Sequence, residues 1–272
     1  MAVIQPALLS DWGMGMRRFA IFGAGLLSIA GFVGAASAAD LPARTYTKAP
    51  VVVDPAYNWS GFYIGIEGGG DWGRSQHYRN DPATPAFNGI AQTGGINPNG
   101  GLVGGTVGYN YEFSNHVVIG IENDISWTNN KGSAFFVAPF GPATNTAQTS
   151  QDWLDTLRGR LGFAWDRWLV FGTGGAAFTN ESVQICNVID GCGSQSQTVT
   201  GWTAGGGVEY AFAGNWSAKL EYLHVDFGSQ HFSRIPVGAG GFDARDVTLT
   251  NDIVRAGVNY KFGWDGPVVA RY

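Results

Sequence analysis

The stretch VRAGVNYKF, residues 254–262, alternates strictly between two kinds of side chain. Successive side chains of an extended chain point to opposite faces. One face of this stretch therefore carries Val254, Ala256, Val258, Tyr260 and Phe262, and the other carries Arg255, Gly257, Asn259 and Lys261. The pattern predicts a β-strand. It leaves open whether the apolar face packs on a protein core or on lipid.

The composition favours an all-β protein. Only 14% of the 272 residues are charged, whereas soluble globular domains average roughly 25%. The chain contains 42 Gly, 10 Trp, 10 Tyr and 17 Phe, and this is unlike helix bundles and α/β enzymes, which use strong helix formers. Beyond the N-terminal region no segment approaches 18 consecutive apolar residues. The mature chain could therefore enter a membrane only as a closed barrel.

The N-terminal region has the three parts of a secretory signal peptide. Arg17 and Arg18 form the basic start, an apolar run extends from residue 19 to about residue 33, and small residues end at Ala38, after which we expect cleavage. A membrane anchor would need about 20 apolar residues, and this run is shorter. Residues 1–15 do not fit a signal peptide, so Met14 or Met16 is an alternative start.

The exported chain would be mildly acidic and would carry two cysteines. Without residues 1–38 it loses Arg17, Arg18 and Asp11, which leaves 14 basic and 20 acidic residues and gives no electrostatic reason to bind nucleic acid. Cys186 and Cys192 lie close together in the sequence, and a local disulfide is the expected state in an oxidising compartment. Metal ligation is the alternative, but no cluster of ligating side chains lies beside them beyond Asp190. We predict no metal and no cofactor.

Eight alternating segments follow, and the connections between them alternate in length. They span residues 61–72, 101–113, 116–127, 153–165, 168–180, 200–212, 216–228 and 248–262. Two or three residues connect the second segment to the third, the fourth to the fifth and the sixth to the seventh. The other connections are long, at residues 73–100, 128–152, 181–199 and 229–247. Short periplasmic turns and long extracellular loops are typical of bacterial outer-membrane barrels.

We therefore predict an all-β fold, an eight-stranded antiparallel up-and-down transmembrane β-barrel. Residues 1–38 are assigned to the signal peptide and residues 39–58, with three prolines, to a periplasmic tether. Residues 59–263 are assigned to the outer-membrane barrel, and residues 264–272 to a short periplasmic tail. The predicted location is the bacterial cell outer membrane.

One face of most segments collects charges of both signs. A soluble β-sandwich would also alternate, but its exposed face would carry most of the charge. Here charge is sparse and changes sign between strands, which suits a narrow lumen lined by compensating pairs. The predicted lumen network is Glu67, Glu112, Glu122, Asp124, Arg158, Arg160, Glu209, Lys219, Glu221, Arg255 and Lys261.

Aromatic side chains recur where the strands would leave the membrane. One predicted row flanks the tight turns and the chain ends: Trp59, Phe62, Tyr111, Phe113, Trp165, Trp168, Phe212, Trp216, Tyr260 and Phe262. A second row near the opposite rim contains Trp72, Trp127, Trp153 and Trp202. Two aromatic belts are expected where rings meet lipid headgroups. The apolar face of residues 254–262 is therefore predicted to contact lipid.

Several motifs resemble a known family of barrels. Arg255, Gly257, Tyr260 and Phe262 are similar to the C-terminal signal that the barrel-assembly machinery reads, although ten residues follow it here. The sequences ASAADLPAR, WSGFYIGIEGGGDWG, LRGRLGFAWDRWLVFGTGGAAF, AKLEYLHVDFG and NYKFGWDGPVVARY resemble the alphaproteobacterial outer-membrane surface-antigen family, the RopB-type immunogenic barrels. The resemblance implies an eight-stranded barrel similar to the transmembrane part of the OmpA class, with no enzymatic activity.

The sequence leaves three functions open. The first is a non-enzymatic barrel that supports envelope integrity and presents four loops to lipopolysaccharide or to host or other surface ligands. The second is a narrow small-solute porin with a charged lumen. The third is a lipid-modifying enzyme, because His231 and Ser233 pair a base with a hydroxyl, although such a pair is weak without a positioned acid. Outer-membrane lipids would surround the barrel in each case.

Overall fold

The computed structural model describes residues 57–83, 85–139, 144–189, 191–237 and 241–263. The strands are β1 (Gly61–Arg79), β2 (Asn99–Glu112), β3 (Val117–Thr128), β4 (Lys131–Phe135), β5 (Thr146–Trp165), β6 (Trp168–Asn187), β7 (Gly191–Ala213), β8 (Trp216–Val237) and β9 (Gly241–Lys261). A short 3-10 helix, η1, covers Pro85–Phe87. Within these ranges no helix has the length and apolar character needed to cross a membrane.

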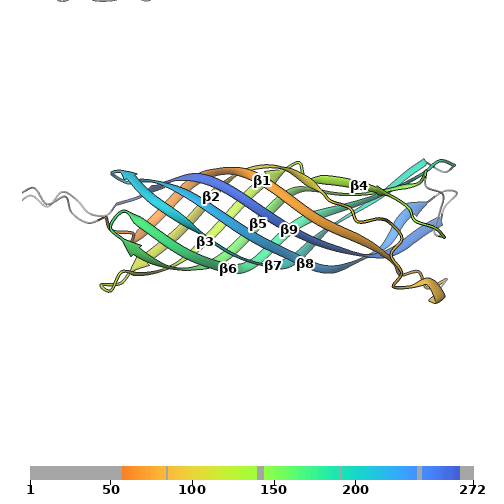
Figure 1. Cartoon of the computed structure of the whole chain (residues 1–272), viewed down its shortest axis with the longest axis horizontal. Helices are drawn as coiled ribbons and strands as arrows, with labels where there is room; N and C mark the ends of the chain where they lie inside the picture. Colours follow the sequence, from red (N-terminus) through yellow and green to blue (C-terminus); the bar gives the residue numbers. More distant parts are fainter. Residues whose placement is uncertain (1–56, 84, 140–143, 190, 238–240, 264–272) are drawn as a thin grey trace, which may run out of the picture. The chain divides into compact units, whose positions relative to one another are not determined.

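The strands close into an antiparallel ring (Figure 1). Apart from the short strand β4, which pairs with β2 and β5, each strand pairs with the next one in the chain, and β3 pairs with β5. The ring closes where β1 pairs with β9, from Tyr63 opposite Lys261 to Arg79 opposite Arg245. Eight strands form the complete ring. The predicted eight-stranded antiparallel barrel is therefore confirmed.

The register of the ring sets the width of the barrel. Paired residues lead from strand to strand through Tyr63, Gly108, Glu122, Arg158, Gly175, Thr203, Val225, Asn251 and Gly73. Following these pairs once around the barrel leads from Tyr63 to Gly73, which lies ten residues further along β1. This stagger means that the strands are strongly tilted against the barrel axis. Strand number, stagger and diameter are linked, and eight strands leave an interior just wide enough for side chains.

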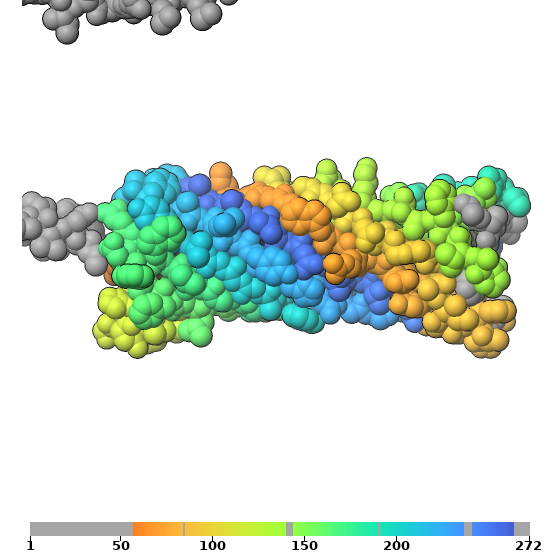
Figure 2. All heavy atoms as spheres, in the orientation of Figure 1, coloured from red at the N-terminus to blue at the C-terminus, as the bar shows by residue number. Residues whose placement is uncertain are grey.

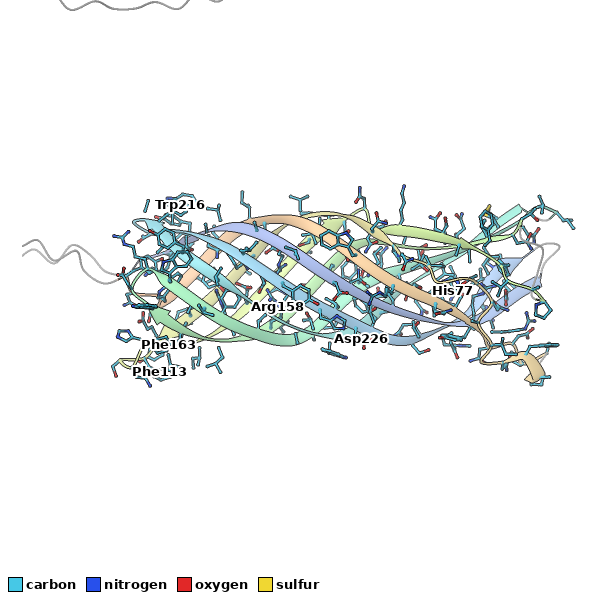
Figure 3. The ribbon with its side chains drawn as sticks, viewed as in Figure 1. His77, Phe113, Arg158, Phe163, Trp216 and Asp226 are labelled. Atoms are coloured by element: carbon cyan, nitrogen blue, oxygen red, sulfur yellow. A yellow bond between two sulfur atoms is a disulfide. The ribbon has the colours of Figure 1, made fainter. Side chains whose placement is uncertain are left out.

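The two faces of the strands differ as the alternation predicts. Outward residues such as Ile66, Ile121 and Leu161 are more than half exposed, whereas inward residues such as Glu122 and Arg158 are buried. Figure 3 places Phe113, Phe163 and Trp216 together at the end with the tight turns, and Arg158 in the middle of the barrel. On the face in Figure 2, side chains of β1, β8 and β9 form an unbroken wall.

One member of the predicted aromatic row lies inside the barrel instead. Trp59 is only 2% exposed and packs with Val118, Leu169 and Phe171, and the ring of Tyr57 stacks on its edge. The chain before β1 turns under the barrel, and the interior offers Trp59 more apolar contact than the rim would. Residues 57–60 thereby close the end with the tight turns.

Two of the four predicted long loops, at residues 181–199 and 229–247, are mostly strand, which corrects the prediction there, and the other two, at residues 73–100 and 128–152, are strand only in part. Strands β5 to β9 continue far beyond Trp153 and Trp202, and the ladders of β6 with β7 and of β8 with β9 extend to the pairs Asn187–Gly191 and Val237–Gly241. We call this continuation, together with β4 and residues 90–96, the crown. Its inward side chains form a buried core of Ile96, Phe136, Ala147, Val183, Ile185, Phe232, Ile235 and Val247.

The ring of the crown also has eight members, because two other segments stand where β2 and β3 would continue. β2 begins at Asn99 and β3 ends at Thr128, and their places are taken by residues 90–96 and by β4 with Phe136. The amide of Gln92 donates to the His77 carbonyl, and the amide of Val137 donates to the Gln92 carbonyl, both at 2.9 Å. These hydrogen bonds join residues 90–96 to β1 and to the segment that follows β4, and so cover those strand edges. The predicted signal peptide, most of the tether and the whole of the predicted tail lie outside the described residues.

Candidate functional site in the barrel lumen

Strand alternation brings nine of the eleven predicted lumen charges into one buried cluster. Its members are Glu67 on β1, Glu122 and Asp124 on β3, Arg158 and Arg160 on β5, Glu209 on β7, Lys219 and Glu221 on β8, and Arg255 on β9. We call this set the lumen network. All nine residues are at most 4% exposed, so the charges can be compensated only by each other and by neighbouring polar groups.

Arg158 occupies the centre of the lumen network. Its Nη1 atom lies 2.6 Å from Oε1 of Glu221, its Nη2 atom lies 2.5 Å from Oε1 of Glu122, and it also pairs with Asp124. The planar guanidinium thus joins carboxylates from β3 and β8 across the barrel. Charge-assisted hydrogen bonds of this kind are about twice as strong as neutral ones.

The other three cations pair with further carboxylates, so that the lumen network holds four cations and five carboxylates. Arg255 pairs with Glu67, and its Nη2 atom lies 2.6 Å from Glu221 Oε2. The Lys219 ammonium lies 3.0 Å from Glu122 Oε1. Arg160 pairs with Glu209, and its guanidinium lies 3.7 Å from the ring centre of Phe171.

Neutral donors satisfy carboxylate oxygens that face the end with the tight turns. The Tyr63 hydroxyl donates to Glu122 Oε2 at 2.6 Å. Ser217 and Asn259 donate to Glu209 Oε1 at 2.5 and 2.8 Å. Removing one member of a buried charge network leaves its partners uncompensated and typically costs 3–5 kcal/mol. The stability of the folded barrel therefore depends strongly on the lumen network.

Two residues predicted for the lumen network, Glu112 and Lys261, lie elsewhere. Glu112 Oε2 accepts the Trp59 amide at 2.9 Å, and the Lys261 ammonium bonds the Asn58 carbonyl and lies 4.6 Å from the Tyr57 ring centre. Both side chains stand at the strand ends, where residues 57–60 turn under the barrel. They hold this segment rather than the network.

Sequence reasoning missed a second buried polar cluster. Asp71, on the lumen face of β1, accepts Nδ2 bonds from Asn130 and Asn251 at 2.7 Å each. Asn251 also donates to Gln151 Oε1 at 2.8 Å. The sequence did contain a signal for Asp71, because it lies four residues after Glu67 and residues four apart on a strand share a face. The glycines between them obscured the alternation.

Apolar layers fill the lumen on both sides of the charges. Beyond the network toward the crown lie Leu102, Leu154, Ala177, Val199, Leu223, Val225, Phe227, Leu249 and Ile253, all buried. At the other end lie Trp59, Val118, Ala164, Leu169, Phe171 and Ala211. The core of the crown adds a third apolar layer. The lumen is thus packed with side chains above and below its charges.

Glu181 and His77 are among the ionisable side chains that are buried in the crown, and His77 Nδ1 lies 3.4 Å from Nη1 of Arg245. Glu181 pairs in the β5–β6 ladder with Gln151, which lies two residues beyond Trp153. Its side chain is 0% exposed, and neither carboxylate oxygen accepts a hydrogen bond. Burial raises the pKa of Glu181 to about 8. His77 bonds Thr149 at 2.8 Å, and burial, with the nearby Arg245, lowers the pKa of His77 to about 3.

The remaining predicted residues are dispersed. The structure joins Cys186 and Cys192 in a disulfide that closes the β6–β7 hairpin. Arg255 and Gly257 face the lumen, whereas Tyr260 and Phe262 stack with Trp216 and Phe62 on the outer rim. His231 lies 2.8 Å from Asp246, but Ser233 has no hydrogen bond to either among the described contacts. Within the described ranges no group of His, Cys, Asp or Glu could hold a metal ion.

The closed ring, the apolar outer wall between two aromatic rows and the buried charged interior define a transmembrane β-barrel of the outer membrane. The family model for the outer membrane protein beta-barrel domain matches residues 24–262. The chain belongs to this family, and within it to the immunogenic outer-membrane proteins of Gram-negative bacteria.

Three comparisons illustrate the relationship. The 31 kDa outer-membrane immunogenic protein of Brucella melitensis is 32% identical over 87% of this chain and 98% of that protein. The 22 kDa outer membrane protein of Rhizobium leguminosarum is 29% identical over 77% of this chain and 81% of that protein. The structure of OprG from Pseudomonas aeruginosa is 13% identical with a TM-score of 0.47, over 75% of this chain and 98% of that one. The Brucella relative is named as an immunogenic protein, and the Rhizobium relative as an outer membrane protein.

Proposed function

We propose that this protein is a non-enzymatic structural barrel that supports envelope integrity and displays the crown at the cell surface. The observation that carries the proposal is the filled lumen. A charge network compensated across β1, β3, β5, β7, β8 and β9 ties opposite walls together, and apolar layers lie above and below it. Such an interior favours mechanical cohesion over passage of solutes.

The crown supplies the surface for interactions. Its hairpin tips carry large apolar side chains that are exposed, including Val188 at 70%, Ile189 at 92% and Phe242 at 62%. Exposed apolar groups at a tip favour contact with host or other surface ligands. Lipopolysaccharide would surround the wall below the crown, and the assembly machinery would read the β9 end during insertion.

The test is conductance of demonstrably folded protein. The exported chain, residues 39–272, is refolded in detergent, its folding is verified by a heat-sensitive gel shift, and it is placed in a planar bilayer. We expect no discrete current steps. Steps that change with Arg158→Ala or Glu122→Gln would replace the structural proposal with a narrow porin, for which the charged lumen is the support.

A further inference from the structure

The outer wall of the barrel has a shallow apolar groove where β1 and β9 lie side by side (Figure 1). The groove has a volume of about 520 Å³, and its outward lining residues are Ile66, Gly68, Val103, Ala218, Ala256 and Val258. The packing of the barrel does not require glycine at position 68, since an added Cβ atom would meet only the Leu102 carbonyl oxygen, at 3.4 Å. The missing side chain instead leaves space on the surface that faces lipid.

A second hollow of about 400 Å³ continues the groove toward the crown. It lies over β2 and the end of β3, where Gly101 and Trp127 line it, and it shares Val103 with the groove. Each step from β1 to the paired residue of β2 leads toward the crown, so a path along the membrane normal from Gly68 passes over β2. An acyl chain that stands upright in the membrane would follow this path.

Two exposed cations stand where the path reaches the rim on the crown side. Arg74 lies on the outward face of β1, two residues beyond Trp72 of the second aromatic row. Lys131 is the first residue of β4. Among the described contacts neither side chain has a hydrogen bond or an ion pair. Each can therefore bind an anionic group from outside the chain.

Residues 97–99 run between the two cations. The Gly73 amide is hydrogen-bonded to this segment at 2.7 Å, and Asn99 pairs with Lys131. The backbones of Arg74 and Lys131 are therefore about two strand spacings apart, on the order of 10 Å. A hollow of about 220 Å³ lies between Arg74 and the segment, whose two exposed asparagines add neutral donors. We call Arg74, residues 97–99 and Lys131 the cation row.

The acids nearest the cation row are bonded to the strands on their far side. Asp252 on β9 accepts the Tyr222 hydroxyl at 2.7 Å and lies 2.9 Å from His224, both on β8. Asp152 on β5 accepts Nδ2 of Asn180, on β6, at 2.8 Å. The two cations are thus the charged groups that the row itself presents to the membrane.

We propose that the groove and the cation row together bind a lipid with acyl chains and two phosphates, the chemistry of the lipid A anchor of lipopolysaccharide. The site rests on the proposed function, in which the crown faces outward, so that the row lies in the outer leaflet. Lysine and arginine at a membrane surface attract anionic head groups, and guanidinium binds phosphate in a bidentate manner. Two cations in one row favour a head group with two phosphates over a phospholipid with one.

The distance between groove and row suits this ligand. Gly68 lies six residues from Arg74 on β1. Six residues of a strand tilted by about 45° advance about 14 Å along the membrane normal. One hydrocarbon leaflet has about the same thickness, half of about 30 Å. An acyl chain can therefore end in the groove while the phosphates lie at the cation row.

Native mass spectrometry of the refolded full chain, titrated with purified lipid A in detergent, tests the cation row. We expect one tightly bound lipid A per chain. Arg74→Gln with Lys131→Gln should weaken binding roughly ten- to thirty-fold. Arg234→Gln, which removes an exposed cation of the crown, should not change it. Lipid A with a single phosphate should bind more weakly than the form with two, and equal affinities would overturn the assignment.

Gly68→Leu tests the groove, because a leucine there fills its floor. The matched control is Gly159→Leu on the outward face of β5, where a Cβ atom also meets only a backbone oxygen, Gly174 O at 3.8 Å. Gly68→Leu should weaken binding about ten-fold, the effect of roughly two fewer buried CH₂ groups, and Gly159→Leu should leave it unchanged. The heat-sensitive gel shift verifies the folding of every variant.

Three results would overturn the proposal. Equal binding by all variants would mean that lipid A covers the wall without a defined site, and no adduct would mean that the wall holds no lipid A. A dimer without lipid would mean that a second copy of the chain covers this face. Each of these results leaves the filled lumen and the structural proposal standing, whereas current steps in the conductance test would overturn the structural proposal and not the lipid site.

Discussion

Arg158 Nη2 and Glu122 Oε1 lie 2.5 Å apart on adjacent strands in the barrel interior, although 36 positions separate them in the chain. The ladder places the two residues directly opposite each other. Around this pair, the lumen network links the walls of the barrel, and its charges are compensated only when all strands are in register.

Arg158→Ala should lower the free energy of unfolding by about 3 kcal/mol or more, because it strands three buried carboxylates. The control is Arg234→Ala, since Arg234 is an exposed crown residue whose side chain has no described partner. Its loss should change stability by less than about 0.5 kcal/mol. Urea unfolding in vesicles measures both. Equal midpoints would contradict the structural role of the lumen network.

Glu181 should make the barrel less stable as the pH rises. Its folded-state pKa of about 8 lies above the ordinary carboxyl value of 4.5, so between these values the folded state holds a proton that the unfolded state has released. Stability is then greatest below pH 4.5 and falls by up to about 1.4 kcal/mol per pH unit until about pH 8. Glu181→Gln should flatten this slope, and Asp226→Asn, at a half-buried position on the outer wall, should not. Unfolding midpoints at several pH values would decide the matter.

Trp59→Ala should destabilise the barrel by roughly 3–5 kcal/mol, the usual cost of truncating a buried large aromatic residue. Trp165→Ala is the comparison, because Trp165 is 77% exposed on the outer rim and should cost much less. The same unfolding assay applies. If the two variants unfolded alike, residues 57–60 would not close the lumen in the membrane.

Removing the disulfide should act locally. Cys192→Ser with Cys186→Ser should change the free energy of unfolding of the membrane wall by less than about 0.5 kcal/mol, because the bridge spans only one hairpin of the crown, which can open locally. Proteolysis near residues 187–191 should become faster. A large drop in global stability would instead indicate that the crown and the membrane wall unfold as one unit.

The membrane wall could be predicted from the sequence because its two faces differ so strongly in polarity. In β3, for example, isoleucines alternate with Glu122, Asp124 and Ser126, and the structure keeps every one of them on the expected face. In β6 the run of small residues from Gly172 to Ala177 hid the alternation, although Leu169 and Phe171 on its inner face are buried.

The crown could not be predicted in the same way. Its strands are rich in Ser, Thr and Gln on both faces, so their periodicity is weak, and strand pairing there depends on contacts between distant segments. Val183 and Phe232 are buried only because residues 90–96 and β4 complete the ring around them. Asp71 and Trp59 depend likewise on tertiary contacts, with Asn251 in one case and Phe171 in the other.

The barrel closes only when β9, the last strand of the chain, pairs with β1. Until residues near Lys261 meet Tyr63, both of these strands present a full row of unpaired amide and carbonyl groups. In a bilayer such open edges have no solvent to satisfy them, and in water they invite pairing with other chains. A ribosome stall or a proteolytic cut shortly before β9 would thus yield an aggregation-prone fragment, whereas the loss of a crown hairpin tip would leave the wall closed.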